Sequence, residues 1–118
     1  MAAFRILITG INGLIGGILQ SAFHEYYKVF GLDLDGPFSD RVVQADISRY
    51  HQVAKAVQKY SPLDSIVHLA GNPRVKASWE EVLEANIVGT RNVFEAARES
   101  SLPAPTMSLA LMMVSSLN

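Results

Sequence analysis

A glycine-rich stretch near the amino terminus has the residue types and spacing of a phosphate-binding turn. An apolar run, Phe4–Ile8, suits a buried parallel strand, and three glycines follow it at the spacing G-x-x-G-x-x-G. Gly10 lets the chain turn sharply, Gly13 leaves room for a pyrophosphate, and Gly16 lets the next helix pack close to the strand. The start of that helix presents unpaired N–H groups and a positive dipole end to a phosphate. A turn without a ligand has the same pattern, so a second signal is needed.

An acidic residue supplies that second signal. Asp33 lies near the end of the next apolar run, 28–34, at 23 positions after Gly10. In a nucleotide-binding βαβ unit, a carboxylate near this position accepts hydrogen bonds from both hydroxyls of the adenosine ribose. Each such bond is worth roughly 1.5–3 kcal/mol. Because a 2′-phosphate would be repelled there, Asp33 predicts NAD rather than NADP as the cofactor. The alternative is that Asp33 only caps the loop that follows it.

Strand and helix patterns alternate around these residues and predict an α/β fold. Strands are expected over residues 4–8, 28–34, 42–45, 65–70 and 109–114. Helices are expected over 13–25, from Asp46 or Ser48 to Tyr60, and over 78–100, where Ser78 and Glu81 form a capping box. The apolar residues expected on the inner faces of these helices are Ile15, Leu19, Ala22, Phe23, Val53, Ala54, Val57, Tyr60, Trp79, Leu83, Ile87, Val93, Phe94 and Ala97.

Several polar positions have two interpretations each. Asp46 ends a strand on the side where an adenine would lie, and it equally suits the N-cap of the next helix. His68 stands between apolar neighbours inside a strand, which favours a packing role over catalysis. Arg74 and Lys76 follow the carboxyl end of that strand, where open α/β sheets bind ligands, but a solvated loop charge is the simpler interpretation.

A glycine inside the third predicted helix also needs an explanation. Gly89 costs about 1 kcal/mol relative to alanine in a helix interior. We therefore expect close approach of another element at Gly89, or a polar partner for Asn86.

Composition bounds the class of protein. The chain has 118 residues, of which 49% are hydrophobic and 18% charged, and this suits one globular domain. A net charge of −1 gives no bulk attraction to nucleic acid or to an anionic membrane. The chain has no cysteine, which excludes disulfides and thiolate metal sites, and no metal site is expected. The absence of cysteine fits a cytoplasmic protein, which we expect, and no apolar run approaches the roughly 20 residues of a membrane span.

Five motifs together resemble the extended short-chain dehydrogenase/reductases, the NAD-dependent sugar epimerase/dehydratase superfamily. They are Thr9-Gly10-x-x-Gly13-x-x-Gly16, Asp33, Asp46-Ile47, His68-Leu69-Ala70-Gly71 and Asn86-x-x-Gly89-Thr90. The segments Asp-Leu-Asp-Gly and Ser-Trp-Glu-Glu further resemble uronate and related sugar dehydrogenases. The resemblance implies a dinucleotide held by Gly10, Asn12, Gly13, Leu14, Ile15, Gly16, Asp33, Asp46, Ile47, Leu69, Ala70, Gly71 and Asn86.

The resemblance also implies a fold and a chemistry. The fold is a Rossmann-like, doubly wound parallel sheet with five strands in the order 3-2-1-4-5. The chemistry is hydride transfer between a sugar or nucleotide sugar and the nicotinamide, with a Tyr as base, a Lys four residues later that lowers its pKa, and a Ser or Thr. Ser116 is the nearest match to that hydroxyl, with Ser115 beside it.

The catalytic pair of the superfamily has no counterpart in this sequence. No Tyr is followed four positions later by Lys. We therefore expect residues 1–118 to be an incomplete, cofactor-binding domain that lacks the substrate-binding portion and turns over negligibly alone. A non-enzymatic NAD-binding module, an inactive truncated relative and a relic without a ligand are the alternatives. The predicted strand 109–114 would leave an apolar edge, which predicts self-association or poor solubility.

Overall fold

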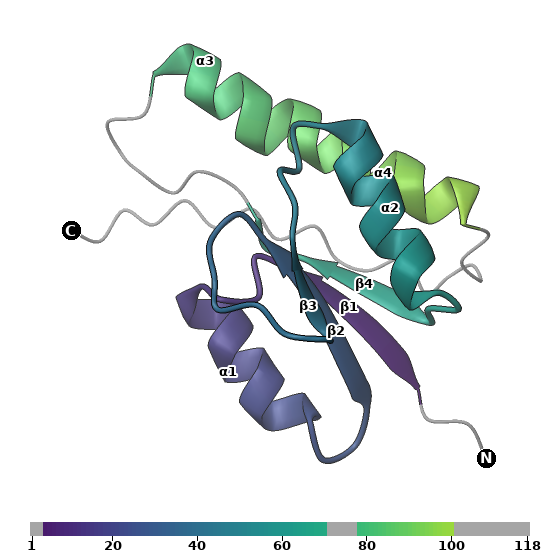
Figure 1. The fold of residues 1–118 in the computed structure, drawn as a ribbon. Coiled ribbons are helices and arrows are strands. Elements are labelled where there is room, and N and C mark those ends of the chain that lie inside the picture. The colour runs from purple at the N-terminus through teal and green to yellow at the C-terminus, as the bar shows by residue number, and fades with distance from the viewer. Residues whose placement is uncertain (1–3, 71–77, 101–118) are drawn as a thin grey trace.

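The computed structural model describes residues 4–70 and 78–100, with four strands and helices between them (Figure 1). The strands are β1 (Arg5–Thr9), β2 (Lys28–Asp33), β3 (Val42–Gln44) and β4 (Ser65–His68). The helices are α1 (Leu14–Phe23), α2 (Tyr50–Tyr60), α3 (Trp79–Val82), the π-helical segment η1 (Leu83–Val88) and α4 (Gly89–Glu99).

The strands form one parallel sheet in the order β3-β2-β1-β4. Thr9 at the end of β1 is paired with Leu32 and with His68, so three strands end at one edge of the sheet. This arrangement confirms the predicted Rossmann-like topology for the first four strands. The predicted fifth strand, 109–114, lies outside the described residues.

Side chains of β1 alternate between two apolar layers, as a strand covered on both faces requires. Ile6 and Ile8 pack in a cluster with Leu19 and Phe23 of α1. Leu7 points the other way and packs in a cluster made by α2 and α4. Figure 1 shows α1 on one side of the sheet and α2 and α4 on the other. The fold is therefore doubly wound, as predicted.

The helices depart from the sequence predictions at their starts and on their outer faces. Helix α2 begins at Tyr50 and has Arg49 as its N-cap, so neither Asp46 nor Ser48 caps it. The helix predicted over 78–100 begins as expected, since the Ser78 hydroxyl accepts a hydrogen bond from the Glu81 N–H at 3.2 Å. It is not α-helical throughout, because η1 interrupts it. Three residues assigned to inner faces are exposed instead: Ala22, Trp79 and Ile87.

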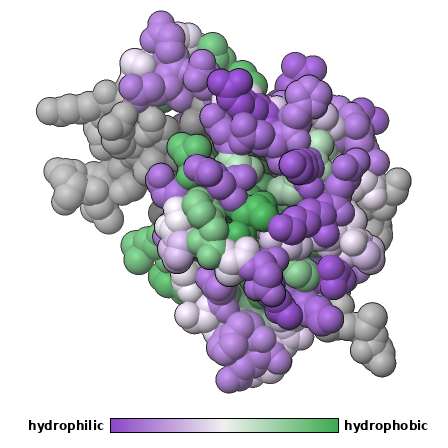
Figure 2. Space-filling view, in the orientation of Figure 1, coloured by the Kyte–Doolittle hydropathy of each residue, from purple (hydrophilic) through white to green (hydrophobic). Residues whose placement is uncertain are grey.

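The described surface is largely polar, with some exposed apolar side chains. Figure 2 shows a face that is mostly hydrophilic, with smaller hydrophobic areas between the polar groups. Leu14 and Ile18 of α1 are 81% and 56% exposed. Within residues 4–70 and 78–100, no helix is long and apolar enough to cross a bilayer. The same residues contain no cluster of His, Asp or Glu that would hold a metal ion.

Candidate functional site

The predicted cofactor-binding residues gather at the carboxyl edge of the sheet. The glycine turn follows β1, Asp33 ends β2, Asp46 follows β3, and Leu69 and Ala70 follow β4. Parallel strands bring their carboxyl ends to the same edge, where open α/β sheets bind ligands. The sheet therefore assembles in one place residues that are far apart in the sequence.

The glycine turn fits tightly against its neighbours. Gly10 has φ +72°, a left-handed conformation that favours glycine, and a Cβ there would lie 2.9 Å from the Ala70 nitrogen. A Cβ on Gly16 would lie 2.5 Å from the Ile11 carbonyl oxygen, so the start of α1 packs on the turn itself. Gly13 is exposed and is the N-cap of α1, and as a glycine it has no side chain that could cap the helix end. The predicted turn at Gly10 is confirmed, whereas the close approach at Gly16 is to the turn and not, as predicted, to the strand.

A ring of hydrogen bonds fixes the Asp33 carboxylate beside this turn. One carboxylate oxygen accepts from the Asn12 N–H at 2.9 Å, and the other accepts from the Asp35 N–H at 3.1 Å. The Asn12 side-chain amide donates to the carbonyl oxygens of Asp35 at 2.7 Å and Pro37 at 3.0 Å. A carboxylate has about four lone-pair positions, so each oxygen keeps capacity for one further donor.

Helix α4 contacts the Asp46–Ser48 segment through Asn92 and Gly89. The Asn92 side-chain amide donates to the Ile47 carbonyl oxygen at 2.8 Å. A Cβ on Gly89 would lie 2.5 Å from the end of the Ile47 side chain, which confirms the predicted close approach at this glycine. Asp46 itself accepts from the Ser48 N–H at 2.9 Å and the Ser48 hydroxyl at 2.7 Å. Its carboxylate therefore shapes the loop, although it caps no helix.

A buried network lies behind the glycine turn and links β1, β4 and α4. The Thr9 hydroxyl lies 2.6 Å from His68 Nδ1, and it also accepts from the Leu69 and Ala70 N–H groups at 3.0 and 3.1 Å. On the other side of the ring, His68 Nε2 lies 3.0 Å from the Thr90 hydroxyl. The side chains of Thr9 and His68 are fully buried, so this network supports the strand ends from which the site is built.

The bonding pattern sets the protonation of His68. The Thr90 hydroxyl donates its only hydrogen to the Asn86 carbonyl oxygen at 2.6 Å. It must therefore accept a hydrogen bond from His68 Nε2–H. Thr9 then donates its hydroxyl proton to Nδ1. Desolvation lowers the pKa of His68 to about 4, which keeps the ring neutral near pH 7. A neutral ring held at both nitrogens is a structural element, and the predicted packing role holds with two partners that the sequence did not reveal.

The arrangement fits a dinucleotide. The exposed Gly13 leaves the start of α1 open to a pyrophosphate, and no side chain of the described residues caps that helix end. The Asp33 carboxylate adjoins the turn through the Asn12 N–H and retains acceptor capacity for ribose hydroxyls. An anion at the helix start and a diol at the carboxylate are the two groups that this edge can bind.

Several residues predicted to contact the cofactor or substrate do not have that contact in the described part of the chain. Gly71, Arg74, Lys76 and Ser116 lie outside the described residues. Asn86 is buried in η1, where its backbone carbonyl serves the Thr90 hydroxyl. The predicted contacts of all these residues with a cofactor or substrate stay predictions.

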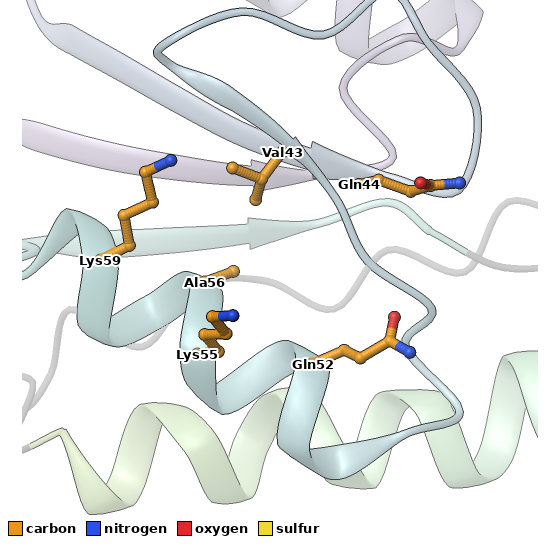
Figure 3. Close-up of a pocket in the computed structure, with 6 residues that line it drawn as sticks. All are labelled: Val43, Gln44, Gln52, Lys55, Ala56 and Lys59. Atoms are coloured by element: carbon orange, nitrogen blue, oxygen red, sulfur yellow. The ribbon is translucent and has the colours of Figure 1, made fainter.

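The structure also has an open cavity away from this edge. It measures about 320 Å³ and lies between β3 and α2 (Figure 3). Figure 3 shows Lys55, Lys59 and Gln52 on α2, facing Val43 and Gln44 of β3. None of the predicted cofactor-binding residues lines this cavity.

Two residues with clear roles were missed in the sequence. The sequence analysis gives Asn92 no role, yet its side-chain amide donates to the Ile47 carbonyl oxygen. Its position three residues after Gly89, on the same helix face, was the available signal. Gly31 of β2 makes room for Ile11, since a Cβ there would lie 2.5 Å from the Ile11 side chain. A glycine inside an apolar strand was the corresponding signal.

Comparison with known proteins identifies a family. The model of the NAD dependent epimerase/dehydratase family matches residues 6–116. L-arabinose 1-dehydrogenase (NAD(P)(+)) of Haloferax volcanii is 34% identical over 96 residues, which cover 79% of this chain and 35% of the relative. Uronate dehydrogenase of Agrobacterium fabrum is 31% identical over 104 residues, which cover 84% of this chain and 38% of the relative.

Solved structures agree with the sequence comparison. A mutant uronate dehydrogenase from Agrobacterium tumefaciens complexed with NAD superposes with a TM-score of 0.70 at 31% identity, over 83% of this chain and 37% of that one. UDP-glucose 4-epimerase of Thermus thermophilus complexed with NAD gives 0.69 at 27% identity, over 84% of this chain and 35% of that one. The chain thus spans little more than a third of the length of these relatives. Because the family model matches almost the whole length of this chain, the chain belongs to the NAD dependent epimerase/dehydratase family.

Proposed function

We propose that this chain is the NAD-binding part of an NAD-dependent sugar dehydrogenase or sugar epimerase/dehydratase. The observation that carries the proposal is the Asp33 carboxylate, which two backbone N–H groups hold beside an open glycine turn. Relatives that include uronate and L-arabinose dehydrogenases support a sugar or nucleotide sugar as substrate of the complete enzyme. The predicted cytoplasmic location and self-association remain parts of this proposal.

The same carboxylate supports a preference for NAD over NADP. The ribose 2′-hydroxyl of NAD can donate to Asp33, whereas the 2′-phosphate of NADP would meet a carboxylate of like charge. Each carboxylate oxygen already accepts one backbone N–H, which fixes the direction of the remaining lone pairs. The preference therefore depends on a preorganised acceptor rather than on net charge.

The residues of this chain bind and orient the cofactor. The bound nicotinamide would supply the hydride acceptor or donor. The start of α1 holds the pyrophosphate, and the buried Thr9–His68 pair keeps the ends of β1 and β4 together. Ser116 would supply the hydroxyl partner near the substrate. Because the sequence has no Tyr-x-x-x-Lys, we assign the proton-transferring base to another part of the complete enzyme.

Calorimetric titration of the purified chain with NAD and NADP tests the proposal. We expect NAD to bind more tightly than NADP, and Asp33→Ala to weaken NAD binding by at least about tenfold, the equivalent of one charged hydrogen bond. Asp35→Ala is the matched control, since the hydrogen bonds of Asp35 with Asp33 and Asn12 use its backbone atoms, which the substitution keeps. A folded chain that binds neither nucleotide would overturn the proposal.

The second candidate function is a non-enzymatic NAD-binding module, which the missing Tyr-x-x-x-Lys favours. The discriminating measurement is NAD reduction with a panel of uronates and aldoses. Turnover by this chain would exclude the module. NAD binding without turnover, even when the catalytic portion of a related sugar dehydrogenase is supplied in trans, would support it.

A further inference from the structure

The side chain of Asn12 joins two loops that the sequence analysis treated separately. Its amide nitrogen donates to the Asp35 carbonyl at 2.7 Å and to the Pro37 carbonyl at 3.0 Å. A side-chain amide has two N–H donors, so both are engaged. The donors of the Asn12 side chain are therefore directed at the loop that follows β2.

The backbone of Asn12 completes a closed circuit with the same loop. Its N–H donates to one oxygen of Asp33, and the other oxygen accepts from the Asp35 N–H. The Asp35 carbonyl in turn accepts from the Asn12 side chain. Asn12, Asp33 and Asp35 are thus joined in a closed circuit of hydrogen bonds, and the Asp33 carboxylate is one member of it.

The loop needs such an anchor because it is exposed. Residues 34–41 are all exposed, and loops of this kind gain little stability from apolar burial. A second side chain, Gln44, also reaches the loop, where it donates to the Leu34 carbonyl at 3.2 Å. Gln44 has no hydrogen bond to Asp33 or Asp35 among those described, so it anchors the loop without orienting the carboxylate.

We propose that Asn12 is a positioning residue for the ribose-binding acid. Its side chain fastens residues 35–37 to the glycine turn and so fixes the Asp33 carboxylate in the orientation that an adenosine ribose needs. The inference rests on the proposed NAD site, and it gives the Asn12 side chain an indirect part in the predicted cofactor binding, through Asp33.

The test uses the whole chain with two Asn12 variants and one matched control. Asn12→Ala removes the side chain, and Asn12→Asp keeps its shape while removing both donors. Gln44→Ala removes the other anchor of the same loop. For each variant, NAD affinity is measured by calorimetry and exchange of the Asp35 amide hydrogen by NMR.

We expect both Asn12 variants to weaken NAD binding about five- to tenfold and to speed exchange of the Asp35 amide, whereas Gln44→Ala changes neither by more than about twofold. The double variant Asn12→Ala/Asp33→Ala should bind NAD no more weakly than Asp33→Ala alone, because Asn12 acts through Asp33. A direct contact with the cofactor would instead give additive losses, which would overturn the positioning role.

The exchange measurement separates this inference from the proposed function. If the chain binds no NAD but the Asn12 variants expose the Asp35 amide, the proposed function fails and the positioning of Asp33 is supported. If NAD binds as proposed but exchange and affinity are unchanged in both Asn12 variants, the positioning role alone is overturned.

Discussion

Two hydrogen-bonded groups adjoin the same edge of the sheet, and they differ in their access to water. The buried group, Thr9–His68–Thr90, has bonds of 2.6 and 3.0 Å, and His68 is 2% exposed. The open group, Asn12–Asp33–Asp35, has bonds of 2.7 to 3.1 Å, but its residues are half-buried or exposed. The bond lengths are alike, so the two groups differ in burial and in charge, since only the open group contains a carboxylate.

The difference separates stability from binding. When a buried hydrogen bond is lost, water cannot reach the donor and acceptor that remain, and the folded state is destabilised by their full desolvation free energy. When an exposed bond is lost, water replaces it at small cost. We therefore expect the buried group to control the free energy of unfolding and the open group to control affinity for the cofactor.

The largest effect is expected at Thr9. Thr9→Val keeps the shape of the side chain but removes the hydroxyl that serves His68 Nδ1 and the Ala70 N–H. Buried groups left without a partner cost about 1–3 kcal/mol each, so the free energy of unfolding should fall by about 3 kcal/mol. Urea denaturation followed by circular dichroism measures this change. Thr9→Ser retains the hydroxyl and is the control, and an equal loss in both variants would contradict the role of the hydroxyl.

The next effect is a pH dependence from the same group. The pKa of His68 is lowered to about 4 in the folded chain, against an ordinary value of 6.5. Above pH 6.5 the ring is neutral in both states, and its stabilising bonds are fully present. Between pH 6.5 and about 4 the unfolded chain binds a proton that the folded chain excludes, so stability falls as the pH falls.

The size of this pH effect follows from the shift, and one variant isolates it. A shift from 6.5 to about 4 corresponds to about 3 kcal/mol of stability lost between pH 7 and pH 4. His68→Gln removes the titrating ring and should remove this part of the pH dependence. Unfolding curves of both chains at pH 7, 5.5 and 4 provide the comparison. Parallel losses in the two chains would show that His68 is not the titrating group.

The open group was largely predictable from the sequence, whereas the buried group was not. Gly10 and Asp33 lie close along the chain and carry a spacing that local rules interpret. The alternation of strands and helices predicted an α/β fold, and the resemblance to the family implied the order of the first four strands, which the structure confirms. The Asn12 side chain was missed as an anchor, because nothing in the spacing shows that the loop after β2 folds back over the glycine turn.

The partners of His68 come from two elements 59 and 22 residues away, Thr9 and Thr90. Such long-range pairs depend on the register of β1 against β4 and on the rotation of α4, neither of which apolar periodicity specifies. Trp79 and Ile87 show the same limit. Their helical spacing predicted that both side chains face the core, yet both are exposed to solvent, Trp79 to 64% and Ile87 to 48%. Periodicity shows which residues share a face and not what covers that face.

The smallest effect on folding is expected at Asn12, and it tests the comparison most directly. Asn12→Ala removes two exposed hydrogen bonds, to the Asp35 and Pro37 carbonyls, and water can take both positions. The free energy of unfolding should therefore change by only about 0.5 kcal/mol, although NAD affinity falls. Urea denaturation beside Thr9→Val, under the same conditions, measures the contrast. A loss at Asn12 as large as the loss at Thr9 would mean that the open loop folds with the core, and burial would then no longer separate a binding group from a stabilising one.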